Sequence, residues 1–116
     1  MNFEVKVGCD LVQISEFEKR IKNNHSLLKN LFSTFELNNN KSIKSLAGVF
    51  AAKEAVVKAL QLKPGSWDLI EIIKLDNGKP TINIHNYDKR IISQDISISH
   101  DGDYALATSC FLIEKK

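Results

Sequence analysis

The sequence predicts an α+β fold in which a small antiparallel sheet packs against a long central helix and several shorter helices. Two observations lead to this class. After one short strand, helical patterns fill the first half of the chain, and strand pairs joined by tight turns fill the second half. Helices and antiparallel strands that are segregated along a chain are typical of α+β proteins.

The first half of the chain begins with a strand and continues with helices. In FEVKVGC, residues 3–9, apolar and charged residues alternate, as expected for a half-buried strand. Apolar residues then recur at helical spacing, with charges between them. Ser33 and Glu36 have the spacing of a capping box that starts a new turn. We expect helices at about residues 12–23, 26–32 and 42–62, a polar loop at 38–41 and a helix-ending turn at 63–66.

The second half of the chain predicts two β-hairpins. The first joins strands 69–75 and 81–86 through a turn with Asn77-Gly78 at its tip. The second joins strands 95–100 and 104–113 through an Asp-Gly-Asp turn. Asn-Gly and Asp-Gly turns between alternating segments are strong signals for hairpins.

Length and composition limit the possible functions. A chain of 116 residues suits one domain, spanning residues 1–116, with a single core. Its hydrophobic content of 43% and charged content of 26% are ordinary for a globular protein. A net charge of +2 argues against nucleic-acid partners and anionic membranes. No apolar run approaches the roughly 20 residues that span a bilayer, so we expect no membrane segment.

The N-terminus and the two cysteines point to the cytoplasm. The first ten residues carry acids and read as a strand, so we expect no signal peptide. Cys9 and Cys110 both lie in predicted strands, and we interpret each as a small buried hydrophobic residue in a reducing compartment rather than as half of a disulfide. Two cysteines without a histidine cluster do not make a zinc site.

The long helix carries charges where its surroundings are apolar. Apolar residues surround almost the whole helix, which indicates burial in a core or partly in a subunit interface. Glu54 and Lys58 share one stripe with Ala47 and Ala51. Charges in such a stripe are costly to desolvate unless they are paired or meet a ligand. One reading is an i,i+4 ion pair between Glu54 and Lys58. The other is a site that a phosphate or a metal approaches over the small alanines.

Asp10 and His100 can likewise be interpreted either as structural residues or as part of a ligand site. Asp10 follows the first strand and suits a helix N-cap. His100 ends a strand and suits a surface or packed residue. Together, however, Asp10 and Glu54 offer hard oxygen ligands for Mg²⁺, which favours one or two carboxylates plus substrate phosphates.

A set of motifs in this order resembles a known family. VGCDLVQI, FSTFE, LAGVFAAKEAVVKAL, NGKP and SISH follow one another over nearly the full length of the chain. Together they resemble the holo-acyl-carrier-protein synthases, which are small 4'-phosphopantetheinyl transferases. The FAAKEAxxKA core, joined to the earlier GxD and the later SxSH, makes this resemblance highly specific.

The resemblance implies a reaction and a site. Such enzymes move 4'-phosphopantetheine from coenzyme A to a serine of an apo acyl carrier protein of fatty acid biosynthesis, and they release adenosine 3',5'-bisphosphate. By motif, Asp10 and Glu54 would bind Mg²⁺ and act in catalysis. Lys58 would hold a pyrophosphate oxygen and stabilise the charge of transfer. The residues implied to contact coenzyme A are Lys53, Lys58, Gly78, Pro80, Ser99 and His100.

The resemblance also implies partners. The family forms homotrimers with active sites between subunits, so we expect a homotrimer. The first predicted helix would dock the carrier protein through residues near Ile14, Glu16, Lys19 and Arg20. The serine must lose a proton, and either a metal-bound water or one of the carboxylates would accept it.

Three positions depart from the family pattern. Val49 replaces an arginine that helps to bind nucleotide phosphates, and we expect weaker coenzyme A binding or a substitute cation. The candidates for that cation are Lys41, Lys44 and Lys53. Glu16 replaces a second arginine and would repel an acidic carrier protein. Gln61 stands where glycine usually ends the long helix, and we expect the following Lys-Pro-Gly turn to take over that role.

These departures leave alternatives open. In one reading the enzyme serves the fatty-acid carrier and the changes are neutral drift; in the other it serves a carrier protein of secondary metabolism. A catalytically weakened homologue that only binds the carrier protein is the main alternative from another functional class. A nucleic-acid-binding domain finds no support, because the chain has no stripe of basic and aromatic residues.

Overall fold

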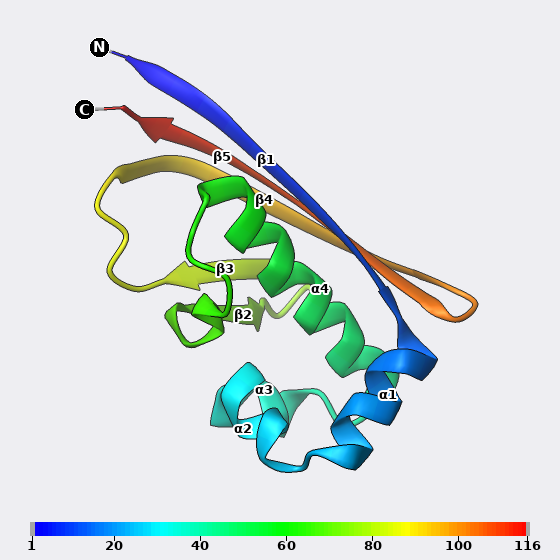
Figure 1. Cartoon of the computed structure of the whole chain (residues 1–116). Coiled ribbons are helices and arrows are strands. Elements are labelled where there is room, and N and C mark those ends of the chain that lie inside the picture. Colours follow the sequence, from blue (N-terminus) through cyan, green and yellow to red (C-terminus); the bar gives the residue numbers. More distant parts are fainter. Residues whose placement is uncertain (1, 116) are drawn as a thin grey trace.

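The computed structural model describes residues 2–115, and its elements follow the predicted order from helices to hairpins (Figure 1). The helices and strands, in chain order, are β1 (Phe3–Gln13), α1 (Ile14–Asn23), α2 (Ser26–Leu31), α3 (Thr34–Asn39), α4 (Ile43–Leu60), the 3₁₀ helix η1 (Ser66–Leu69), β2 (Ile70–Lys74), β3 (Pro80–Ile84), β4 (Arg90–Asp101) and β5 (Tyr104–Glu114). The α+β class is therefore confirmed. No helix within residues 2–115 is long and apolar enough to cross a membrane.

The strands form two antiparallel sheets. β4 and β5 are the second predicted hairpin, and β1 joins them at the free edge of β5, which gives the order β1-β5-β4. The first predicted hairpin forms a separate two-stranded sheet of β2 and β3. In Figure 1, α4 lies between the larger sheet and this smaller hairpin. Both hairpins were predicted from their turns, and both are confirmed.

Strand β1 is longer than predicted and its apolar face is the exposed one. It extends to Gln13, so α1 begins at Ile14, two residues later than expected. Val7 is 65% exposed, and Phe3, Val5 and Leu11 are exposed as well. The predicted alternation is present. However, the apolar residues Phe3, Val5 and Val7 face away from α4, and the residues that face α4 include Gly8, Asp10 and Val12.

The two cysteines lie on the exposed face of the larger sheet. Cys9 and Cys110 are both free thiols, and both are exposed. The expectation of free thiols is confirmed, whereas the expectation that they are buried is wrong. The reason is the same as for β1, because alternate residues of a strand share a face and Cys9 lies on the face of Val7.

Helix α4 contacts β1 directly because of a glycine. A Cβ built on Gly8 would overlap the carbonyl oxygen of Ala55 and would lie 2.7 Å from the amide nitrogen of Ala59. Only glycine allows this close backbone approach. Ser109 of β5 is buried and donates a hydrogen bond to the Ala55 carbonyl at 3.0 Å. The middle of α4 is therefore fixed against the larger sheet.

The end of α4 differs from the prediction. Gln61 itself is the C-cap, in the left-handed conformation with φ 56°, and its N–H donates to the Val57 carbonyl. The Lys-Pro-Gly turn therefore does not end the helix in its place. Lys6 of β1 donates a hydrogen bond to the Gln61 side chain at 3.1 Å, which ties this cap to the sheet.

Side chains from other elements stabilise the starts of α1 and α3. Asp103, in the β4–β5 turn, accepts hydrogen bonds from the backbone and the hydroxyl of Ser15 at the start of α1. The hydrogen bond from the Ser15 hydroxyl lowers the pKa of Asp103. The capping box predicted for Ser33 and Glu36 is present in α3, with both of its hydrogen bonds formed.

Candidate functional site

Asp10 and Lys58 come together across the contact between β1 and α4. The Lys58 ammonium donates to Asp10 Oδ1 at 2.9 Å and to the Cys9 carbonyl at 3.0 Å. The hydrogen bond to Asp10 raises the pKa of Lys58 above its ordinary value of 10.5, and the charges of Asp10 and Glu54 add to this effect. The Asp10 side chain is 15% exposed and that of Lys58 is 55% exposed. A permanently charged ammonium therefore stands beside a carboxylate at the surface.

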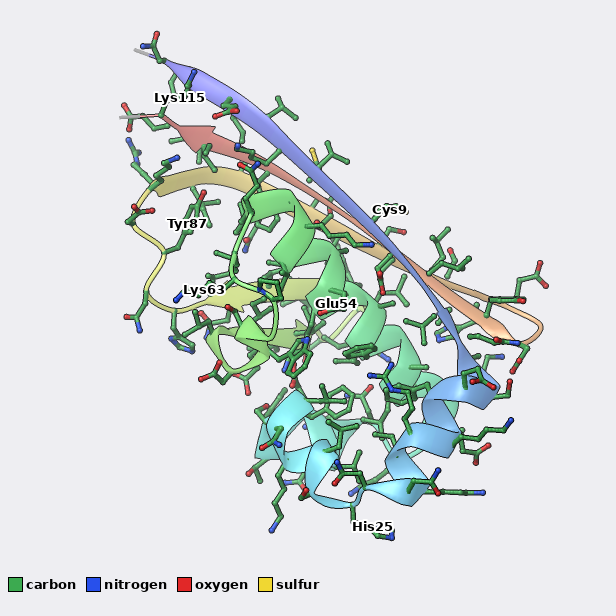
Figure 2. All side chains as sticks on the ribbon, in the orientation of Figure 1. Cys9, His25, Glu54, Lys63, Tyr87 and Lys115 are labelled. Carbon is green, nitrogen blue, oxygen red and sulfur yellow. The ribbon has the colours of Figure 1, made fainter. Side chains whose placement is uncertain are left out.

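Glu54 lies one helical turn before Lys58, near the middle of α4 (Figure 2). Its Oε2 accepts a hydrogen bond from the indole N–H of Trp67 at 2.6 Å. Within residues 2–115, Glu54 takes part in no ion pair, and Lys58 pairs with Asp10 instead. The structure therefore does not form the i,i+4 ion pair considered from the sequence. It equally contradicts the reading of Asp10 as an N-cap, because Asp10 is paired with Ala107 inside the sheet.

Asp10 and Glu54 suit a magnesium ion that a substrate helps to bind. No group of three or more histidine, cysteine, aspartate and glutamate side chains gathers in the part of the chain that the structure describes. Two carboxylates are instead the donor set of a Mg²⁺ site whose remaining ligands are water and substrate phosphate. The charges of Asp10 and Glu54 both act on the Lys58 ammonium. This ammonium could contact the same phosphate, because lysine commonly binds phosphate oxygens.

Lys53, for which the family resemblance implied a contact with coenzyme A, lies in the core. Its side chain is 1% exposed and donates to Glu36 at 2.6 Å and to the Leu31 carbonyl at 2.7 Å. Burial lowers the pKa of Lys53, and the hydrogen bond to Glu36 opposes this effect. Glu36 also accepts the N–H of Ile72, so the pair joins α3, α4 and β2. These contacts leave no donor of Lys53 at the surface, so we do not retain it in the site.

Gly78, Pro80 and His100 meet at a separate cavity of about 260 Å³, which Val49 and Lys74 also line. His100 Nε2 lies 3.0 Å from the Lys44 carbonyl and donates to it. A Cβ on the neighbouring Gly48 would lie 2.8 Å from the same nitrogen, so glycine makes room for the imidazole. Lys74, rather than one of the three predicted lysines, is the cation that lines this cavity beside Val49.

Ser99 does not reach that cavity. It is exposed and paired with Leu106 of β5, and it precedes His100 on β4. Adjacent residues of a strand point to opposite faces, so Ser99 lies on the face of the sheet away from α4. The structure thus separates two side chains that the sequence motif had grouped.

Helix α1 presents fewer free charges than its sequence indicates. Ile14 is buried in the core, so its side chain is not available for docking. Glu16 pairs with Lys19 at 3.3 Å, and Lys22 pairs with Glu18 at 3.6 Å. Among the described residues of α1, Arg20 is the cation that forms no ion pair.

Two residues near these sites were not found from the sequence. Trp67 contacts Glu54 from the 3₁₀ helix after α4, and Lys74 lines the cavity of His100 from β2. No local pattern marks either one. A lysine at the end of a strand is ordinary on a protein surface, and a tryptophan is usually a largely buried packing residue, so neither residue type points to a site.

Comparisons with known proteins agree with the motifs. The family model described as "4'-phosphopantetheinyl transferase superfamily" matches residues 6–109. The holo-[acyl-carrier-protein] synthase of Alkaliphilus metalliredigens is 40% identical over 114 residues, covering 87% of this chain and 93% of the relative. That of Finegoldia magna is 31% identical, covering 96% and 98%.

Solved structures show the same fold. The holo-[acyl-carrier-protein] synthase of Helicobacter pylori, in complex with coenzyme A, superposes with a TM-score of 0.82 at 32% identity, covering 90% of this chain and 98% of that one. The synthase–coenzyme A complex named for Chronobacterium ammoniagenes gives a TM-score of 0.86 at 26% identity, covering 97% and 99%. This chain is therefore an enzyme that belongs to the holo-acyl-carrier-protein synthase family of 4'-phosphopantetheinyl transferases.

Proposed function

We propose that this enzyme transfers 4'-phosphopantetheine from coenzyme A to a serine of an apo acyl carrier protein, with Mg²⁺ and with release of adenosine 3',5'-bisphosphate. The observation that carries the proposal is the 2.9 Å contact between Lys58 and Asp10, with Glu54 one turn away on α4. The named relatives and the coenzyme A complexes of the solved neighbours support the substrates. The cluster supplies what phosphoryl transfer needs, which is positioning and charge neutralisation.

The step breaks one bond and forms another at phosphorus. The serine oxygen attacks the phosphorus that bears the pantetheine arm, and its proton passes to a base, for which a carboxylate of the site or a water molecule is available. The bond from that phosphorus to the bridging oxygen breaks, and the electron pair leaves with adenosine 3',5'-bisphosphate. Asp10 and Glu54 would hold the metal ion, which would supply positive charge to the diphosphate. Lys58 keeps its positive charge at neutral pH and stabilises the negative charge that develops on the phosphate oxygens.

The cavity beside His100 suits the nucleotide end of coenzyme A. It combines the Lys74 ammonium and the His100 ring with an apolar wall that includes Val49 and Pro80. A cation and an imidazole suit a phosphate, and the apolar wall suits a purine ring. We propose that Lys74 partly replaces the arginine that the family carries at the position of Val49.

The enzyme would act as a homotrimer with each site shared between two subunits. Val49 and Glu54 lie about 140° apart around α4. The carboxylates and the His100 cavity of one chain therefore lie on different sides of this helix, and a complete site would combine the carboxylates of one subunit with the cavity of another. The exposed apolar face of β1, together with Leu106 on β5, is the kind of surface that an oligomer buries. Sedimentation equilibrium would test this, and a monomeric mass at assay concentration would contradict it.

The carrier protein would dock at α1, in the cytoplasm. Arg20 offers the unpaired positive charge of this helix to an acidic partner, while Glu16 is satisfied by Lys19. Transfer rates on a panel of apo carrier proteins would identify the pathway. Comparable or higher rates on the fatty-acid carrier would contradict a dedicated role in secondary metabolism.

Mass spectrometry of an apo carrier protein tests the function directly. The protein should gain the mass of one phosphopantetheine arm, only with coenzyme A and Mg²⁺ present, and the gain should disappear when the acceptor serine is changed to alanine. A carrier protein that binds but gains no mass would favour the alternative of a binding module without catalysis.

A further inference from the structure

The indole N–H of Trp67 contacts the carboxylate of Glu54, and the proposed chemistry leaves this contact without a role. Trp67 Nε1 donates to Glu54 Oε2 at 2.6 Å, from η1 to α4. We propose that Trp67 is a positioning residue, which fixes the Glu54 side chain so that its other oxygen is available to a divalent ion held jointly with Asp10. The inference rests on the proposed function, because it assumes that Glu54 binds metal.

No other described group orients this carboxylate. Within residues 2–115, the hydrogen bond from Trp67 is the one that Glu54 accepts through its side chain, and Glu54 forms no ion pair. Lys58, its neighbour one turn along, is held by Asp10 and by the Cys9 carbonyl. A free glutamate side chain samples several rotamers, and fixing it in advance removes that entropy cost from metal binding.

An indole is well suited to this task. Its N–H is a donor only, so it binds one oxygen of the carboxylate and cannot compete as a ligand. It is also neutral, so the carboxylate keeps the full negative charge that attracts a divalent ion. An ammonium in the same place would cancel that charge. Removal of a group that holds a metal ligand in this way commonly weakens metal affinity by about 10- to 100-fold.

The indole itself is held by its surroundings. Its ring lies 6.2 Å from that of Phe50 in a tilted arrangement, and Phe50 stacks on Phe17 of α1 at 5.4 Å. Phe50 and Phe17 are both buried. The carbonyl of Trp67 accepts the N–H of Ile70, which closes η1 onto β2. The N–H is thus presented from a rigid aromatic row, which a positioning group requires.

Binding of Mn²⁺ provides a readout apart from activity. We would titrate the full chain, with coenzyme A present, and follow free Mn²⁺ by electron paramagnetic resonance. Trp67→Phe keeps an aromatic ring and removes the N–H, and it should weaken Mn²⁺ binding about tenfold. Glu54→Gln removes the charge of the ligand and serves as the reference. In the Glu54→Gln background, Trp67→Phe should cause no further weakening, because the two act through one contact.

An isosteric replacement separates the N–H from the volume of the ring. The chain contains a single tryptophan, so feeding 3-benzothienylalanine, in which sulfur replaces the N–H, changes Trp67 alone. This protein should lose as much Mn²⁺ affinity as Trp67→Phe. If both bind Mn²⁺ like the wild type while Glu54→Gln does not, the positioning role is wrong and the proposed function stands. If Glu54→Gln also binds Mn²⁺ like the wild type, the metal role of Glu54 is wrong, and the inference fails with it.

Discussion

Gly8 of β1 lies directly against Ala55 of α4, so closely that a Cβ on Gly8 would overlap the Ala55 carbonyl oxygen. Asp10 follows Gly8 on the same face of the strand, and Glu54 precedes Ala55 on the helix. The two proposed metal ligands are therefore neighbours of the two residues that bring strand and helix together. The glycine in the GxD motif acts through packing, and the aspartate is the residue for which we propose a metal-binding role.

The first prediction concerns Gly8→Ala. The added methyl group must push α4 away from β1, because the atoms it meets are backbone, and we expect destabilisation of about 3 kcal/mol or more. Urea denaturation monitored by circular dichroism would measure it. Gly65→Ala is the matched control, because nothing lies within 4 Å of its Cβ position and its only cost is the left-handed φ of 87°. Equal losses for the two variants would contradict the packing role of Gly8.

The second prediction concerns Glu54→Gln. Glutamine keeps the shape and an oxygen that accepts the Trp67 N–H, so the free energy of unfolding should change by less than about 1 kcal/mol. Loss of an anionic ligand should lower the transfer rate about 100-fold or more. Rates would be measured by mass spectrometry of the carrier protein over a range of Mg²⁺ concentrations. Glu114→Gln, at the far end of β5, is the control, and unchanged activity of Glu54→Gln would remove Glu54 from the site.

Local patterns predicted the hairpins, the capping box and the long helix because each depends on residues close in sequence. The face of β1 was harder. Alternation shows which residues share a face, but not which face meets the helix, and the valines of β1 turned out to be on the exposed side. Gly8 determines which face of β1 meets α4, because only the face that carries this glycine can approach the helix so closely.

The partners of the charged residues were hardest to predict. Lys53 and Lys58 are both lysines of one helix, yet Lys53 pairs with a buried glutamate 17 residues earlier and Lys58 with an aspartate 48 residues earlier. Tertiary packing sets both pairs, and helical spacing carries no information about either. The same reason hid Trp67, whose contact with Glu54 depends on how η1 folds back onto α4.

The third prediction concerns Lys58→Ala. If the ammonium acts mainly in the transition state, kcat should fall about 100-fold, and KM for coenzyme A should rise much less. Because the contact with Asp10 raises the pKa of Lys58, the wild type should not lose this contribution until the pH exceeds 10.5. Steady-state kinetics would measure both constants, with the exposed Lys63→Ala as a control for charge. A raised KM for coenzyme A with kcat unchanged would mean that Lys58 only binds substrate.

The fourth prediction concerns the buried pair of Glu36 and Lys53. Lys53→Met leaves the Glu36 carboxylate buried without its cation, which should cost about 3–5 kcal/mol. Adding Glu36→Gln removes the stranded charge, so the double variant should be more stable than the single one. Thermal unfolding would compare the three proteins. A Lys53→Met variant that folds normally but shows a raised KM for coenzyme A would support the phosphate-binding role first inferred from the sequence.

The fifth prediction concerns Gln61→Gly at the end of α4. Gln61 adopts φ 56° and ψ 43°, a conformation that costs a residue with a Cβ roughly 1 kcal/mol relative to glycine. Glycine loses the hydrogen bond from Lys6, but that contact is exposed, and Lys6 keeps its ion pair with Glu4 at 3.1 Å. We therefore expect Gln61→Gly to stabilise the fold by about 0.5–1 kcal/mol.

Gln61→Ala separates the two contributions, because alanine loses the same hydrogen bond and retains the backbone strain. In urea denaturation, Gln61→Ala should have a midpoint equal to or slightly below that of the wild type, whereas Gln61→Gly should have a higher one. If the two variants were equally stable, the left-handed cap would carry no strain. The departure from the family's glycine at this position would then be energetically neutral, in contrast to what the backbone conformation indicates.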